Sequence, residues 1–223
     1  MNLTIDQKAR EVLDNLASNP RLNHFIDCQL PIPQTYRGTD PIKLIILGQD
    51  PTVKNVKSRA TITTVLNLDK PGNIYNYLSR ICNRLDFDLE NIYASNYLKN
   101  FFKDPPTQIT EIDVFKEFAP YWFPLLREEL AQFPQVPIII LGEPLLSAIV
   151  CGGASPCVRD YWGYKPDWKS GERSTYCCLE PDKNILGHVV FPFPHQPSIG
   201  KQFYAERFGG YVAFVKQQLN VGI

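Results

Sequence analysis

Four short runs of apolar residues alternate along the chain with longer segments of helical character. The runs cover residues 42–47 (IKLIIL), 92–95 (IYAS), 136–141 (VPIIIL) and 188–191 (HVVF). They are rich in Ile and Val, which strands favour. Three of the four lack a clean alternation of apolar and polar positions, which indicates strands that are covered on both faces, as in a parallel sheet. The pattern therefore predicts four parallel strands.

The segments between these runs repeat their apolar residues at a spacing of three and four, which is typical of helices. They cover residues 74–85, 112–130 and 145–149, and a last amphipathic segment covers 203–219. We expect the adjacent glycines Gly209 and Gly210 to loosen the middle of that last helix. Alternating strands and helices predict an α/β fold, with three α/β/α layers around a central four-stranded parallel sheet.

The composition, with 44% hydrophobic and 12% aromatic residues, is sufficient for one buried core. Two irregular stretches, 20–41 and 151–183, do not divide the chain convincingly, so we expect a single domain over residues 1–223. No run approaches the roughly 18 apolar residues that a membrane span requires. The polar start, MNLTIDQKAREVLDNL, is typical of an amphipathic helix rather than of a signal peptide. We expect a soluble, cytoplasmic monomer that does not contact a membrane.

Charge and cysteine content exclude some classes of function. The 23 basic and 23 acidic side chains cancel, so a nucleic-acid interaction must depend on a local surface rather than on a global field. The six cysteines show no CxxC spacing, which disfavours a structural metal cluster, and a cytosolic chain disfavours disulfides. We expect no metal and no cofactor.

Polar side chains follow the predicted strands where ligands bind in open parallel sheets, beyond the carboxyl ends. Asp50 follows the first run, Asn96 the second, Glu143 the third and His195 the fourth. Each alone could form a turn or cap a helix. Together, a carboxylate, an amide and an imidazole can hydrogen-bond to a flat heterocycle and stabilise charge as a bond to it breaks.

The residues around these positions resemble the motifs of the uracil-DNA glycosylase superfamily. LIILGQDP at 44–51 is similar to the first motif, and IYASNYLKNFFKDPP at 92–106 to the second-strand pattern. PHQPSI at 194–199 resembles the late motif, and NIY at 73–75 resembles the helix entry before the second strand. The matches occur in the family's order over about residues 42–215. The four spaced cysteines of the iron-sulfur branch are not reproduced.

The resemblance implies a DNA glycosylase that flips a uracil or related deaminated base out of DNA, in base excision repair. Asp50 would position the hydrolytic water and stabilise the positive charge on the sugar. His195 would donate a hydrogen bond to the departing base. Asn96 would bind the Watson-Crick edge of the base, where a mismatched base would leave the amide unpaired.

Further residues receive roles from the same resemblance. Gln49 would contact the base through its backbone, and Thr52 stands where the best-known branch has a tyrosine against uracil C5. Ser198 would contact a DNA phosphate, and Ile199 would enter the base stack as a wedge. Lys99, with other basic residues nearby, is a candidate for neutralising the DNA backbone. An ordinary solvated lysine is an equal interpretation.

Several departures from the family's motifs leave alternative functions open. Thr52 is smaller than tyrosine, so selectivity against thymine is not determined. Residues 60–68 (ATITTVLNL) contain no aromatic stacking platform, which Tyr97 could replace. Gln196 replaces a proline of the late motif, which shifts the possible alignment of Ile199 by one residue. A noncatalytic nucleobase- or DNA-binding member of the superfamily is therefore the main alternative. An esterase of the α/β-hydrolase type is disfavoured because no GxSxG motif occurs.

Overall fold

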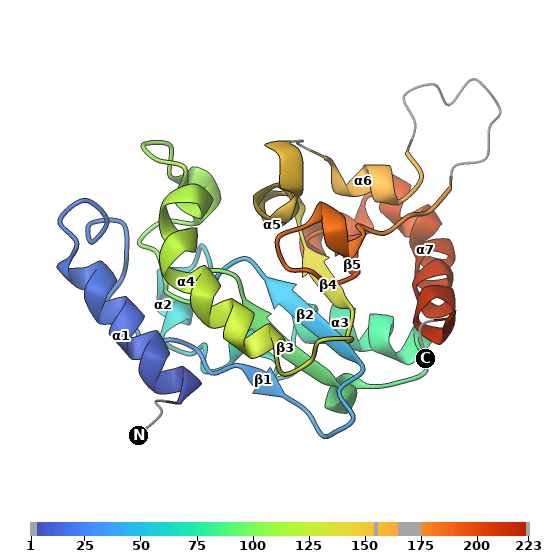
Figure 1. Cartoon of the computed structure of the whole chain (residues 1–223), viewed down its shortest axis with the longest axis horizontal. Coiled ribbons are helices and arrows are strands. Elements are labelled where there is room, and N and C mark those ends of the chain that lie inside the picture. Colours follow the sequence, from blue (N-terminus) through green and yellow to red (C-terminus); the bar gives the residue numbers. More distant parts are fainter. Residues whose placement is uncertain (1–3, 154–155, 165–174, 222–223) are drawn as a thin grey trace.

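A mixed sheet forms the centre of the protein, with helices on both of its faces (Figure 1). This computed structural model describes residues 4–153, 156–164 and 175–221. Within these residues the sheet has five strands in the order β1-β3-β2-β4-β5. Their bounds are Tyr36–Arg37 for β1, Leu44–Gly48 for β2, Ile92–Asn96 for β3, Ile138–Leu141 for β4 and Val190–Phe193 for β5. The α/β class is confirmed.

The first strand was not expected, so the prediction of a four-stranded sheet is corrected. β1 runs antiparallel to β3, with Tyr36 opposite Ala94 and Arg37 opposite Tyr93. The other three strand pairs, β2 with β3, β2 with β4 and β4 with β5, are parallel. A strand of two residues is too short to carry a periodic pattern, which is why stretch 20–41 was interpreted as irregular.

The four longer strands lie where the apolar runs predicted them, with shifts of up to two residues. All residues of β2 and β3 are buried, as expected for strands covered on both faces. β5 begins at Val190 and includes Pro192, which has no N–H to donate. A proline is tolerated there because β5 is an outer strand of the sheet. His188 precedes β5 and its Nδ1 lies 2.8 Å from the carbonyl oxygen of Val136.

Helices form where the apolar spacing predicted them, and Figure 1 shows α3 and α4 on opposite faces of the sheet. The predicted segments correspond to α1, α3, α4, α5 and α7. The helices are α1 Ile5–Ser18, α2 Val56–Arg59, α3 Asn73–Arg84, α4 Val114–Leu130, α5 Glu143–Ile149, α6 Val158–Tyr161 and α7 Gln202–Val221. The irregular stretch 151–183 contains α6, and part of it lies outside the described residues.

The last helix corrects one expectation, because α7 continues without a break through Gly209 and Gly210. A Cβ atom on Gly210 would overlap the hydroxyl of Tyr176. The glycine at this position therefore allows Tyr176 to pack closely against the helix, rather than loosening it.

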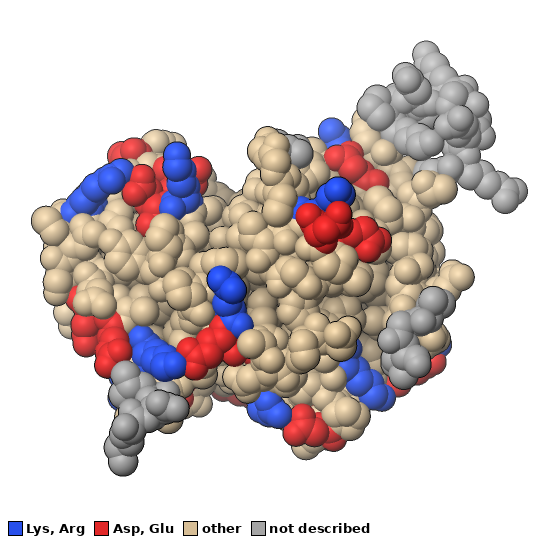
Figure 2. Space-filling view, in the orientation of Figure 1, with Lys and Arg blue, Asp and Glu red and all other residues tan. Residues whose placement is uncertain are grey.

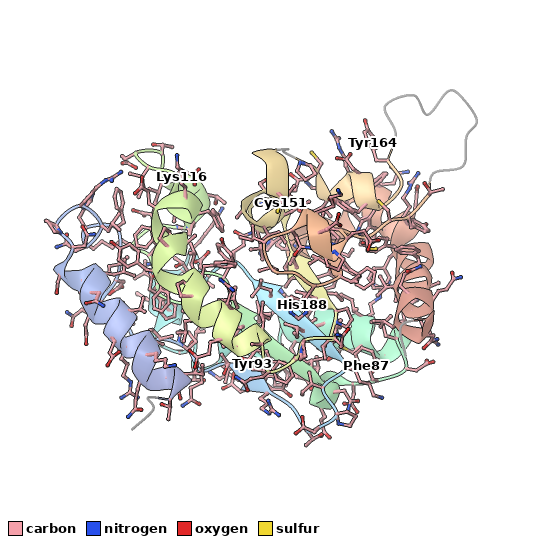
Figure 3. All side chains as sticks on the ribbon, viewed as in Figure 1. Phe87, Tyr93, Lys116, Cys151, Tyr164 and His188 are labelled. Atoms are coloured by element: carbon pink, nitrogen blue, oxygen red, sulfur yellow. The ribbon has the colours of Figure 1, made fainter. Side chains whose placement is uncertain are left out.

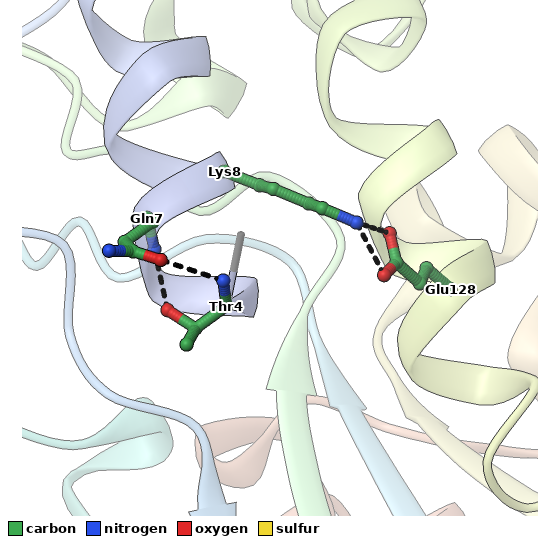
Figure 4. A network of polar contacts seen from close by, with 4 residues as sticks. All are labelled: Thr4, Gln7, Lys8 and Glu128. Carbon is green, nitrogen blue, oxygen red and sulfur yellow. Dashed lines mark hydrogen bonds and ion pairs between the residues drawn. The ribbon is translucent and has the colours of Figure 1, made fainter. Parts of the chain in front are cut away.

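A capping box begins the first helix, and an ion pair joins that helix to α4 (Figure 4). Thr4 accepts a hydrogen bond from the Gln7 amide, and the Gln7 side chain accepts one from the Thr4 amide, which completes a capping box. Lys8 on α1 lies 2.6 Å from Glu128 on α4. These contacts place α1 beside α4, near the end of β3.

Candidate functional site

The strand order reverses between β2 and β4, and in open α/β sheets the carboxyl ends of two such strands flank a crevice. The chain leaves β2 toward β3 on one side, and it leaves β4 toward β5 on the other side. Such a reversal is the position at which open α/β sheets bind ligands. Gln49 and Asp50 follow β2 at this crevice, and Gly142 follows β4.

Gln49 connects the two sides of the crevice. Its Nε2 donates to the carbonyl oxygen of Leu141 at 3.3 Å, and its own carbonyl accepts from the Leu98 amide at 2.8 Å. Gly142 has a φ of 99°, and a Cβ on it would lie 2.7 Å from Gln49 Nε2 and 3.7 Å from the Cβ of His195. Gln49, Gly142 and His195 are therefore neighbours. The sequence did not assign a role to Gly142, although a glycine directly after a buried strand was a usable signal.

Asn96 lies at the end of β3, opposite Gly48 of β2. Its side chain is 1% exposed, and its Oδ1 has no hydrogen-bond partner among the described residues. A Cβ on Gly48 would overlap this oxygen and would lie 2.9 Å from Leu66 Cδ2. Leu66 therefore packs beside the amide, where the sequence showed no aromatic platform.

Asp50 is held by the turn that follows it. Its Oδ1 accepts a hydrogen bond from the Thr52 amide at 2.7 Å. Burial raises the pKa of Asp50 to about 6, while hydrogen bonds from Thr52 and the charge of Arg59 oppose this rise. The carboxylate is thus ionised at neutral pH, but its pKa is close enough to neutrality for proton transfer.

Thr52 has a structural role in this loop. Its Oγ1 accepts a hydrogen bond from the Phe102 amide at 2.8 Å. This bond joins the loop after β2 to the segment after β3, so Thr52 stabilises the relative position of Asp50 and Asn96. Whether Thr52 also contacts a base stays a prediction.

Arg59 is a structural residue of the site that the sequence did not reveal. It is 2% exposed, and its Nε donates to the Val53 carbonyl at 2.9 Å. The same guanidinium donates to the carbonyls of Phe102 and Lys103, both at 2.8 Å. Because Arg59 lies in a polar stretch (TVKNVKSR), no sequence pattern distinguished it from a surface arginine.

His195 begins the turn 196–200 after β5. Partial burial of the ring lowers the pKa of His195, although the residue as a whole is exposed, so the imidazole is neutral at pH 7. The carbonyl of Pro194 accepts from the Tyr77 hydroxyl at 3.2 Å, and that of His195 accepts from the Ser198 amide at 2.8 Å. Ser198 is half-buried in this turn, and Ile199 packs partly against the core.

The position of Lys99 corrects the prediction that this residue neutralises the DNA backbone. Lys99 is 5% exposed rather than solvated, and its Nζ lies 2.8 Å from Oε1 of Glu129, a fully buried residue of α4. The same ammonium donates to Ser95 Oγ at 2.6 Å. Lys99 is therefore unavailable to DNA phosphates. Glu129 shares a helical face with Trp122 and Leu126, and an acid on an apolar face signals a buried cation.

The structure brings Asp50, Asn96 and His195 to one edge of the sheet through their neighbours. Gly48 lies against Asn96, and Gly142 lies between Gln49 and His195. The turn that follows Gln49 holds Asp50. Among the hydrogen bonds of the described residues, none joins two of these three side chains directly. The Asn96 amide oxygen is therefore buried at this edge without a partner among the described residues.

An open groove begins beside this edge, between α4 and α5. Its volume is about 540 Å³, and its wall includes Tyr97, Phe115 and Ile185. Figure 2 shows a hollow on this face, and Figure 3 places Lys116 on its α4 side. Asp113 and Lys116 are the charged residues of its lining. Tyr97 directly follows Asn96 in the chain, so the groove borders the segment that continues from the end of β3.

No protein-family model matches the chain, and no curated protein matches it in sequence. In the described part of the chain, no helix is both long and apolar enough to cross a membrane. The same residues contain no group of three or more His, Cys, Asp or Glu side chains that could hold a metal ion. All six cysteines are free thiols.

Proposed function

We propose that the protein is a DNA glycosylase of the uracil-DNA glycosylase superfamily, with the corresponding fold, that removes uracil or a related deaminated base. One observation carries this proposal: a buried amide oxygen without a partner, on Asn96, lies at the sheet edge shared by Asp50 and His195. A buried acceptor without a donor is costly, so a ligand that supplies one is favoured. The N3–H of uracil is such a donor.

The chemistry follows from the three side chains. Water would add its oxygen to C1′ of the deoxyribose, while the C1′–N bond breaks and its electron pair leaves with the base. Asp50, as a carboxylate, would orient the water, stabilise the cationic sugar and accept the proton released. Neutral His195 would donate a hydrogen bond to the anionic base, which later receives that proton. Gln49 would contact the base through its backbone.

The DNA contacts in this proposal come from the turn after β5. Ser198 would contact a phosphate, and Ile199 would fill the position of the flipped nucleotide. Figure 2 shows acidic and basic side chains mixed on the visible face, so affinity would depend on these contacts more than on a basic field. We take the protein to act as a cytoplasmic monomer on single- or double-stranded DNA.

A second candidate is a noncatalytic nucleobase-binding member of the same superfamily. The burial of Lys99 against Glu129 favours it, because this removes one expected cation from the DNA surface. Such a protein would bind free bases or nucleotides at Asn96 without turnover.

Oligonucleotides that carry uracil, hypoxanthine, xanthine or a thymine mispair, in single strands and duplexes, distinguish the two. The glycosylase would leave abasic sites that alkali cleaves, and Asp50→Asn would lower their formation by about 100-fold or more. Asp14→Asn, which changes an exposed carboxylate of α1, is the matched control and would leave the rate unchanged. Binding of bases without any abasic product would favour the noncatalytic candidate.

A further inference from the structure

A small cavity is lined in part by Asn96. Its volume is about 20 Å³. Its lining combines the polar residues Asp6, Thr35, Asn96, Lys99 and Glu129 with the apolar residues Ile5, Ala9, Ile32, Pro33 and Val65. A cavity of roughly 10 to 15 Å³ can hold one water molecule if it offers polar partners. The volume is sufficient, and five lining residues carry polar side chains.

Two of the lining residues have oxygens that can accept a further hydrogen bond. Asn96 Oδ1 and Glu129 Oε1 are both buried and have no hydrogen-bond partner among the described residues. Lys99 approaches Glu129 Oε1 at 2.8 Å as an ion pair, but it directs its hydrogen bonds to Ser95 Oγ and to Glu129 Oε2. A water molecule has two O–H donors, one for each of these oxygens, and the second lone pair of the Asn96 amide oxygen is left for the N3–H of a base.

The ion pair also fixes the strand that carries Asn96. Ser95 Oγ donates to Glu129 Oε2 at 2.7 Å, which ties the end of β3 to α4. Lys99 Nζ lies 3.5 Å from the backbone carbonyl of Asn96 itself. Replacing a buried ion pair by apolar residues is often neutral or stabilising, so the pair does not need a stability role.

We propose that one water molecule in this cavity bridges Asn96 Oδ1 and Glu129 Oε1, and that Lys99 and Glu129 thereby determine which way the Asn96 amide faces. They are positioning residues, since neither would touch the base. Orientation matters because the oxygen of the amide accepts from N3–H of uracil, whereas a flipped amide presents its NH₂ to N3 of cytosine. The bridge would favour uracil over cytosine. The bridge stands on the structure alone, and its effect on base choice rests on the glycosylase function proposed above.

The test combines crystallography with a double substitution. Lys99→Met with Glu129→Leu removes both charges while keeping apolar bulk. Lys8→Met with Glu128→Leu is the matched control, because that pair also involves α4 but is 33% and 48% exposed. We expect crystals of the wild type to show an ordered water within 3.2 Å of both oxygens, a hydrogen-bond distance. We expect the uracil-to-cytosine excision ratio to fall by about tenfold or more in the first double variant only.

Each outcome tests a separate part of the proposal. Wild-type density without a water between the two oxygens would overturn the bridge, whether or not the double variant folds. A bridge with an unchanged excision ratio in a folded double variant would overturn the positioning role. If the wild type excises no base, the proposed function fails, and the ratio is then replaced by the affinities for free uracil and free cytosine, which must show the same tenfold change.

Discussion

Gly48 and Asn96 are register partners at the carboxyl ends of β2 and β3, and the absence of a side chain on Gly48 leaves room for the Asn96 amide. This relationship connects the two motifs that suggested the function. It also explains why a glycine follows four large apolar residues in β2, at a position where the strand needs no unusual backbone angle.

Gly48→Ala should therefore impair activity more than folding. The added Cβ would overlap Asn96 Oδ1 and crowd Leu66, which would displace the amide from the base. We expect a loss of about 100-fold in kcat/KM, typical of a misplaced binding group. Gly72→Ala is the control, because no atom lies within 4 Å of a Cβ there. Equal activity of both variants would show that the Asn96 position does not matter.

Asp50→Asn should make the protein more stable while it removes activity. The pKa of Asp50 is raised from 3.8 to about 6, so the folded state disfavours the carboxylate. That penalty is absent below about pH 4, grows between about pH 4 and 6, and is complete above. Asparagine still accepts from the Thr52 amide. We expect thermal unfolding to show a gain of roughly 1–3 kcal/mol at pH 7 and none at about pH 4.

Thr52→Val should shift the pH dependence of activity. Valine has the same shape but cannot accept from the Phe102 amide or lower the pKa of Asp50. The rise of kcat/KM with pH, expected near pH 6 in the wild type, should move to higher pH. Unfolding should also become easier by about 1–3 kcal/mol, the cost of an unpaired buried amide. Thr52→Ser keeps the hydroxyl and should retain the wild-type profile, and an unshifted profile in the valine variant would argue against this role.

Arg59→Met should destabilise the loop that carries Asp50. The substitution leaves the carbonyls of Val53, Phe102 and Lys103 without their donor. We expect a loss of about 2–4 kcal/mol in urea unfolding, compared with less than about 0.5 kcal/mol for Arg10→Met on the exposed side of α1. Similar losses in both variants would mean that the buried guanidinium has no special role.

The sequence predicted those elements that have a strong period or an apolar run. The strands β2 to β5 and the helices α1, α3, α4, α5 and α7 are of this kind. β1 was missed because its pairing with β3 depends on contact across the sheet, not on local pattern. The unbroken α7 depends in the same way on Tyr176, which packs where Gly210 has no side chain.

For the site, the sequence placed Asp50, Asn96 and His195 at one edge because parallel strands end there together. It could not predict the burial of Lys99, because a lysine after a strand gives the same sequence pattern whether it is exposed to solvent or paired with Glu129. Arg59 was invisible for a related reason: its partners are backbone carbonyls, which carry no sequence signal. The pattern of residues therefore cannot predict tertiary contacts that are made by polar side chains.

Release of free base from DNA tests the central claim most directly. A strand with one uracil, incubated with the wild type, Asp50→Asn or His195→Ala, can be assayed for free uracil by mass spectrometry. Cooperation of the acid and the imidazole at one edge of the sheet predicts uracil release by the wild type and a reduction of about 100-fold or more in each variant. No uracil from the wild type, or equal amounts from all three proteins, would contradict it.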